Sequence, residues 1–66
     1  MGHDTPALCP LGITARLLHV PVAWLRAEAE AGRVPHLQAG RALLFDPDVV
    51  ERVLLERARR EVSHAS

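Results

Sequence analysis

The sequence has no lysine and no tyrosine, and it holds one cysteine, one tryptophan and one phenylalanine. With a single cysteine, Cys9, no disulfide can form within the chain, which is typical of an intracellular protein. Cys9 and the histidines are too widely spaced for a zinc-finger pattern, so we expect no metal site. No apolar run approaches the roughly 18 residues of a membrane span, and no signal-peptide pattern opens the chain. We therefore expect a cytoplasmic protein, associated with the nucleoid if it binds DNA.

The usual sequence signals of catalysis are also lacking. There is no glycine-rich phosphate loop, no nucleophile with a base beside it, and no pair of carboxylates in a plausible pocket. The chain of 66 residues is one small domain that buries only about 60% of its unfolded surface, which leaves little room for a cleft. The sequence therefore predicts a protein that is not an enzyme and that uses no cofactor or small-molecule substrate.

An excess of basic charge, which DNA-binding domains usually carry, is lacking too. Eight arginines balance eight acidic residues, and the formal net charge is zero. Residues 1–45 hold four arginines against three acidic residues, whereas residues 46–66 hold four against five. Any nucleic-acid surface is thus expected in the first part of the chain, with a modest affinity for one copy.

Two helices separated by a short turn are predicted first. Apolar or small residues at helical spacing follow Cys9 and Pro10, with proline tolerated at the first helical position, and they continue to about Leu18. His19 and Val20 form the turn, and a second helix runs from Pro21 to about Ala31. Winding this helix at about 100° per residue gives one buried side, on which Glu28 would pair with an arginine of another element. That side carries Trp24, Leu25, Glu28 and Ala29.

Glycine and proline then predict a β-hairpin. Gly32 stands where the helix needs a left-handed stop, and Pro35 cannot continue a helix. Gly40 and Arg41 give a turn between two short strands at about residues 35–38 and 42–45. On the first strand, Leu37 would face the core and its two polar neighbours would face away.

A third helix begins at Asp46, which caps free backbone N–H groups, followed by Pro47 at the first helical position. We expect this helix to end near Val62. Residues 1–8 would form a flexible arm, residues 9–62 the folded domain and residues 63–66 a frayed end. The predicted core consists of Trp24, Leu25, Leu37, Phe45, Val49, Val53 and Leu54.

The order of elements, mostly α-helical with a small β-hairpin, is that of a winged helix-turn-helix domain. The residues Leu17-Leu18-His19-Val20, Gly32-Arg33-Val34-Pro35, Gly40-Arg41 and Phe45 resemble the excisionase-like domains, small relatives of the DNA-binding domain of MerR-type regulators. The resemblance covers roughly residues 9–55. It implies that the second helix enters the major groove and that the hairpin wing lies on the backbone or in a minor groove. Where this family often has glycine before the valine of the turn, the chain has His19.

Two arginines are the strongest candidates for contacts with double-stranded DNA. Arg26 lies in the middle of the second helix on its solvent side, where a guanidinium reaches a phosphate or the O6 and N7 atoms of guanine. Its place after Leu25 resembles the Leu-Arg pair of MerR-type domains. Arg41, at the hairpin tip, is placed to enter a minor groove or to hold a phosphate. The alternative for both is an exposed charge, with Arg26 weakly paired to Glu30.

The other candidates are exposed positions on the helices and the wing. Two would touch a thymine methyl, and the rest would contact phosphates; the alternative for each is an ordinary solvated side chain. Glu30 is unfavourable near a phosphate unless it reads a cytosine amino group. These further candidates are Arg16, Val22, Ala23, Arg33, His36 and Gln38.

A second function stays open, namely a protein-interaction module on the same scaffold that does not bind DNA. The zero net charge and the small apolar residues at the head of the second helix favour it. Under this hypothesis an exposed apolar patch binds a partner, or the third helix pairs with a second copy through Val50, Leu54 and Ala58. Under the DNA hypothesis, a second copy would raise the affinity for a specific site.

Overall fold

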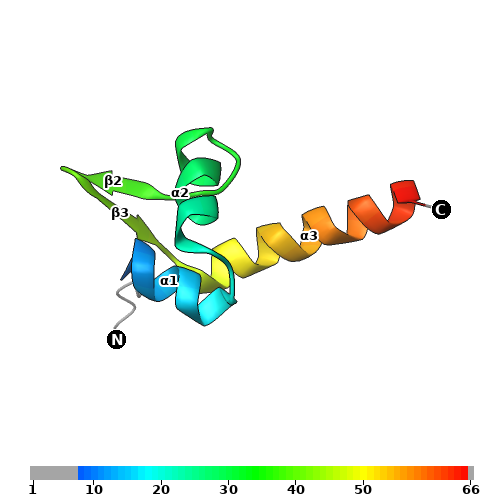
Figure 1. Ribbon diagram of the computed structural model, residues 1–66, viewed down its shortest axis with the longest axis horizontal. Coiled ribbons are helices and arrows are strands. Elements are labelled where there is room, and N and C mark those ends of the chain that lie inside the picture. The colour runs from blue at the N-terminus through cyan, green and yellow to red at the C-terminus, as the bar shows by residue number, and fades with distance from the viewer. Residues whose placement is uncertain (1–7, 66) are drawn as a thin grey trace, which may run out of the picture.

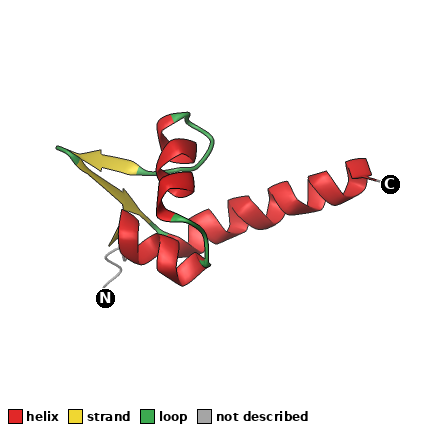
Figure 2. Cartoon of the chain, in the orientation of Figure 1, coloured by secondary structure: helices red, strands yellow, loops and turns green. Residues whose placement is uncertain are grey.

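A computed structural model describes residues 8–65, with side chains for residues 8–62. The elements in order are β1 (Cys9–Pro10), α1 (Leu11–Leu18), α2 (Val22–Glu30), β2 (Leu37–Ala39), β3 (Ala42–Phe45) and α3 (Pro47–Ala65) (Figure 1). The described part of the chain is therefore mostly helical, with three helices and one three-stranded antiparallel sheet (Figure 2). No helix among the described residues is long and apolar enough to cross a membrane. Most of the predicted N-terminal arm, residues 1–7, lies outside the described residues, as does Ser66.

The sheet has the strand order β1-β3-β2 and contains one strand more than the predicted hairpin. Cys9 pairs with Phe45 and Pro10 pairs with Leu44, so the residues predicted to begin the first helix form a short strand instead. Pro10 has extended backbone angles, φ −62° and ψ 163°, and helix α1 begins one residue later. The Thr14 hydroxyl donates a hydrogen bond of 2.9 Å to the Pro10 carbonyl, which joins the new strand to the helix after it.

The turn between α1 and α2 depends on a left-handed residue. His19 has φ 59° and ψ 41°, the conformation that glycine adopts most easily. Its backbone N–H donates to the Arg16 carbonyl, and the Val20 N–H donates to the Ala15 carbonyl at 3.0 Å. This pattern is a Schellman motif, which satisfies the carbonyls at the end of α1.

The predicted helix stop at Gly32 and the predicted hairpin turn at Gly40 are both confirmed. Gly32 has φ 80° and its N–H donates to the Ala29 carbonyl at 3.0 Å, which ends α2. Gly40 has φ 64° and makes the tip of the hairpin with Arg41. The second predicted strand agrees with β3, whereas β2 begins two residues later than predicted, at Leu37.

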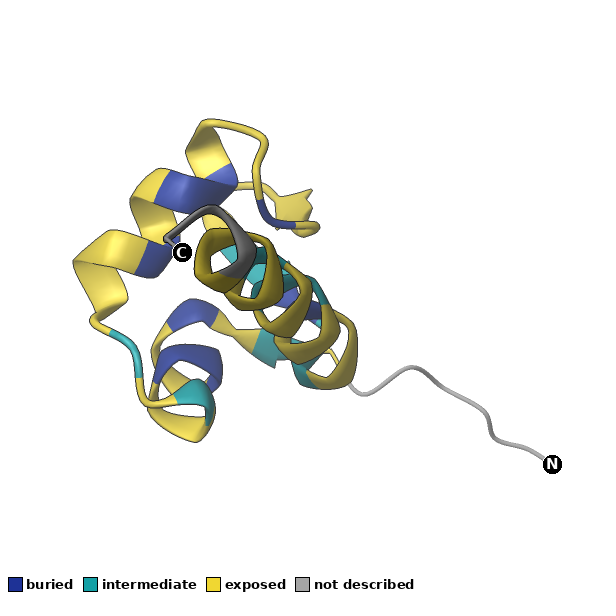
Figure 3. Ribbon diagram, turned by 90° about the vertical axis from the view of Figure 1, so that its right-hand side faces the viewer, coloured by how far each residue is buried: buried dark blue, intermediate teal, exposed yellow. Residues whose placement is uncertain are grey.

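The core is formed by α1, α2, the α2–β2 connection, the end of β3 and the start of α3, and α1 packs against α2, β3 and α3. Figure 3 shows the buried positions on the facing sides of α1 and α2, whereas the outer half of α3 is exposed. Leu25 and Phe45 are fully buried as predicted, and Val53 and Leu54 are half-buried. The buried hydrophobic residues are Leu11, Ala15, Leu25, Ala29, Val34, Phe45 and Val50.

Three predicted core residues are wrong. Leu37 is 52% exposed, and Val49 and Trp24 are each 36% exposed. All of β2 is exposed, so alternation along it does not separate a core face from a solvent face. Leu37 and Val49 line a groove that is open to solvent in the described part of the chain, and Trp24 lies at the edge between α2 and α3.

Helix α3 begins as predicted and ends later. The Asp48 N–H donates to the Asp46 carboxylate at 3.1 Å, which is the expected cap. The helix continues to Ala65, three residues beyond the predicted end at Val62. Its second half extends away from the rest of the fold (Figure 1).

Candidate nucleic-acid interface

A groove of about 400 Å³ lies between the start of α1, one side of α2 and the β2–β3 hairpin. It brings together four of the eight predicted DNA-contacting residues, which come from two separate elements. These four are Val22, Arg26, Gln38 and Arg41. The rest of the lining consists of Pro10, Leu11, Gly12, Glu30, Ala42 and Leu43.

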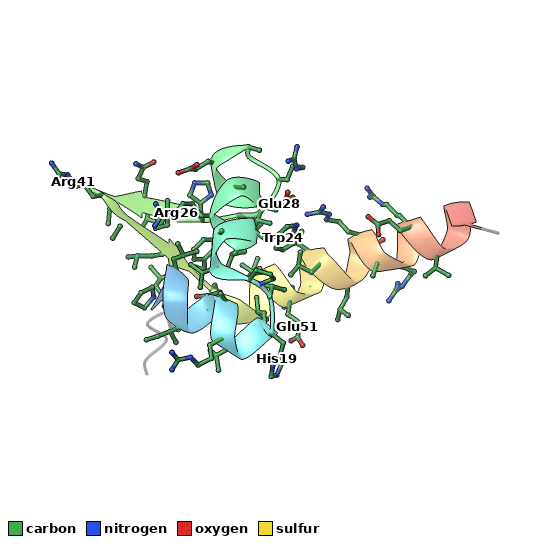
Figure 4. The ribbon with its side chains drawn as sticks, viewed as in Figure 1. His19, Trp24, Arg26, Glu28, Arg41 and Glu51 are labelled. Atoms are coloured by element: carbon green, nitrogen blue, oxygen red, sulfur yellow. The ribbon has the colours of Figure 1, made fainter. Side chains whose placement is uncertain are left out.

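Helix α2 supplies the groove with a stripe of three exposed residues. Val22, Arg26 and Glu30 follow one another at intervals of four, so they lie one above the other on a single side of the helix. Figure 4 places Arg26 on the hairpin side of α2, whereas Trp24 and Glu28 lie on the side towards α3. No hydrogen bond or ion pair within the described residues engages the Arg26 guanidinium.

The hairpin supplies the other wall. Arg41 extends from its tip (Figure 4), and no other described side chain or backbone group holds its guanidinium. Gln38 lies across the same tip, where its side-chain amide donates to the Gly40 carbonyl at 3.4 Å. The groove therefore has an uncommitted guanidinium on each wall, and its lining also contains one carboxylate, that of Glu30 on α2.

Arg33 lies outside this groove, because it is held by Glu28. Its Nε donates to Glu28 Oε1 at 2.9 Å and its Nη2 donates to Oε2 at 3.2 Å, a bidentate ion pair. The Arg33 side chain is still 59% exposed, so it remains open to solvent on its other edge. Hydrogen bonding to Arg33 is the main cause that lowers the pKa of the Glu28 carboxyl, and Glu28 raises the pKa of Arg33 in return.

Glu28 holds a second arginine from α3. Arg57 Nη1 donates to Glu28 Oε1 at 2.9 Å, and the Arg57 guanidinium lies 5.7 Å from the centre of the Trp24 ring. This confirms the prediction that Glu28 pairs with an arginine of another element. The cluster of Trp24, Glu28, Arg33 and Arg57, called here the Glu28 cluster, lies on the side of α2 away from the groove (Figure 4). It fixes how α2 sits against α3 while the opposite side of α2 stays open.

The remaining three candidates lie outside the groove lining. Arg16 and Ala23 are exposed, on α1 and α2 respectively. His36 Nδ1 donates to the Val34 carbonyl at 3.0 Å, and its ring lies 6.1 Å from that of Phe45. His36 is thus held against the base of the hairpin, with Nε2 left for another contact.

Sequence reasoning did not anticipate that the start of α1 borders the groove. Gly12 and Leu11 line it because strand β1 brings the start of α1 beside β3. The described residues contain no group of three or more His, Cys, Asp or Glu side chains that could hold a metal ion.

Comparisons with known proteins identify no relative, so the function is inferred from this geometry alone. No protein-family model matches the chain, and searches of curated proteins and of solved structures find no similar protein.

Proposed function

We propose that this protein binds double-stranded DNA as a winged helix-turn-helix domain, in the role of a small transcription regulator or an excisionase-like architectural factor. Helix α2 would enter the major groove, and the β2–β3 hairpin would serve as the wing. The observation that carries the proposal is the groove with two uncommitted guanidiniums, Arg26 on α2 and Arg41 at the hairpin tip. Exposed arginines that no acidic side chain engages are suited to phosphates and to guanine.

The four predicted contact residues that line the groove each have a chemical role in this proposal. Arg26 pairs with guanine O6 and N7, and Val22 touches a thymine methyl one helical turn earlier. Arg41 holds a phosphate or enters the minor groove, and Gln38 beside it donates to the backbone. Arg16 on α1 adds a contact to the backbone from outside the groove.

The Glu28 cluster has a supporting role. A recognition helix reads bases only when its side chains are held in one orientation relative to the wing. The ion pairs from Glu28 join α2 to the α2–β2 connection through Arg33 and to α3 through Arg57. They therefore support the orientation of α2 relative to the hairpin and to α3.

Titration of the protein into labelled random duplexes, followed by fluorescence anisotropy at low and physiological salt, tests the proposal. Each phosphate contact contributes a slope of about −0.9 to log K against log salt. Arg26→Ala should weaken binding to a selected site, whereas Arg52→Ala, which removes an exposed arginine of α3 outside the groove, should change it little. Absence of binding at low salt would refute the proposal.

One observation favours the second candidate, a surface for a second copy of the chain. Ile13 and Leu17 on α1 and Leu55 and Val62 on α3 are each more than half exposed. Val50 is fully buried, so the predicted contact between copies through that residue is wrong. In this candidate Leu55 and Val62 replace it, because they lie seven residues apart on the projecting half of α3. Sedimentation equilibrium of the chain and of Leu55→Ser tests this candidate, since only a dimer through α3 would be lost on substitution.

A further inference from the structure

The carboxylate of Glu30 is the part of the groove that phosphate binding does not explain. It lies one helical turn beyond Arg26 on the same stripe of α2 and lines the same groove as Arg41 and Gln38. A negative charge there repels a phosphate backbone, which weakens any binding that depends on charge alone. In a groove that bound only phosphates, this carboxylate would only weaken the binding.

The other carboxylate of α2 shows that pairing with arginine is available in this fold. Glu28, two residues earlier, accepts hydrogen bonds from Arg33 and Arg57. The Glu30 side chain has no hydrogen bond or ion pair within the described residues, although Arg26 lies four positions before it. In a helix, an acidic residue four positions after its basic partner is the weaker order for such a pair. Glu30 therefore presents two free acceptor oxygens to the groove.

We infer that Glu30 is a base-reading residue, which accepts a hydrogen bond from the exocyclic amino group of cytosine in the major groove. This inference rests on the proposed function. An ionised carboxylate can only accept hydrogen bonds. In the major groove cytosine presents the N4 amino donor, whereas guanine presents two acceptors and adenine presents an acceptor beside its amino group. Cytosine is therefore the base whose edge suits a carboxylate without an unfavourable contact.

The spacing on α2 fixes how far apart the two readings lie. Four residues of an α-helix rise about 6 Å, and neighbouring base pairs are about 3.4 Å apart. Arg26 and Glu30 would thus contact base pairs one to two steps from each other, with guanine under Arg26 and cytosine under Glu30. Each of the two contacts would distinguish one orientation of its own G·C pair from the reverse, because the Arg26 donors suit guanine and the Glu30 acceptors suit cytosine.

Selection of sites from a random duplex pool tests this, with the wild-type chain and the variants Glu30→Gln and Glu51→Gln. Both substitutions remove one negative charge, but Glu51 is an exposed residue of α3 outside the groove (Figure 4). Glutamine donates and accepts together, which suits adenine N6 and N7. We expect Glu30→Gln to change the preferred base at one position from cytosine to adenine and to weaken binding to the original site about tenfold. Glu51→Gln should leave both the preferred sequence and its affinity close to those of the wild type.

Other outcomes would overturn the inference in distinguishable ways. If Glu30→Gln binds every duplex more tightly with an unchanged sequence preference, Glu30 acts only by repelling phosphates. If the wild type binds with a steep salt dependence but selects no cytosine, the proposed function stands and this inference fails. If the wild type binds no duplex at low salt, both fail.

Discussion

Glu28 and Arg57 are separated by 29 residues in sequence, and their side chains meet at 2.9 Å. The same Glu28 oxygen also accepts the Nε–H of Arg33, and the guanidinium of Arg57 lies over the ring of Trp24. Glu28 is 7% exposed, so these arginines compensate a carboxylate that lies largely out of water. One acidic side chain thereby joins α2, the α2–β2 connection and α3, leaving the opposite side of α2 open.

Glu28→Gln should destabilise the protein. The substitution removes the charge that both arginines approach and leaves at least one guanidinium hydrogen bond without a suitable acceptor. Thermal unfolding followed by circular dichroism should show a lower melting temperature than that of the wild type. Glu51→Gln is the control, because Glu51 is exposed and has no ion pair in the described structure, and it should change the melting temperature little. Equal melting temperatures for the two variants would contradict a structural role for the cluster.

The stability should also depend on pH through Glu28. The hydrogen bond from Arg33 is the main cause that holds the pKa of Glu28 below its ordinary value of 4.5 in the folded chain. A carboxyl whose pKa is lower when folded contributes its full stabilisation above its unfolded pKa. That contribution declines as the pH falls from there through the folded pKa. Urea unfolding between pH 7 and pH 3 should show a loss of stability that is smaller in Glu28→Gln, whereas identical profiles would exclude this residue as the cause.

The left-handed turn between α1 and α2 gives a prediction of the opposite sign. His19 has φ 59°, and its side chain is exposed without a hydrogen bond in the described structure. Glycine adopts this conformation without the strain of a Cβ, so His19→Gly should stabilise the fold by about 0.5–1 kcal/mol. Gly32→Ala is the matched test, because Gly32 has φ 80° and open space around its Cβ position. It should destabilise the fold by about 1 kcal/mol through backbone strain alone, and chemical denaturation of both variants measures this.

The sequence predicts a structural feature correctly where the signal lies in one residue, and it fails where the feature depends on residues far apart in the chain. Gly32 and Gly40 were located correctly because the left-handed conformation of a turn is a property of one residue. Strand β1 is not predicted from the sequence because its pairing partner β3 lies more than thirty residues later. Hydrophobicity predicts Trp24 in the core, but its ring lies beside the guanidinium of Arg57, a contact that no local spacing rule predicts.

The residues of the candidate site likewise separate into those that local position predicts and those that depend on distant contacts. Arg26 and Arg41 are predicted contact residues because of their positions on a helix and at a turn, and the structure places both in the lining of one groove. That Arg33 is engaged by Glu28 could not be foreseen, because the ion pair forms only once the chain reverses at Gly32. Gly12 lines the groove because β1 pairs with β3, and this pairing between distant residues is not predicted from the sequence.

Arg26→Lys separates base reading from charge. Lysine keeps the positive charge but lacks the planar pair of donors that fits guanine O6 and N7 together. If Arg26 reads a guanine, the variant should bind a selected site about 1–3 kcal/mol more weakly, while its affinity for random duplexes and its salt slope stay close to those of the wild type. Arg41→Ala should do the reverse, since loss of a phosphate contact weakens binding to all sequences and reduces the salt slope by about 1. Anisotropy titrations at several salt concentrations distinguish the two. Equal effects of Arg26→Lys on selected and random duplexes would mean that α2 approaches the backbone and that another element reads the bases.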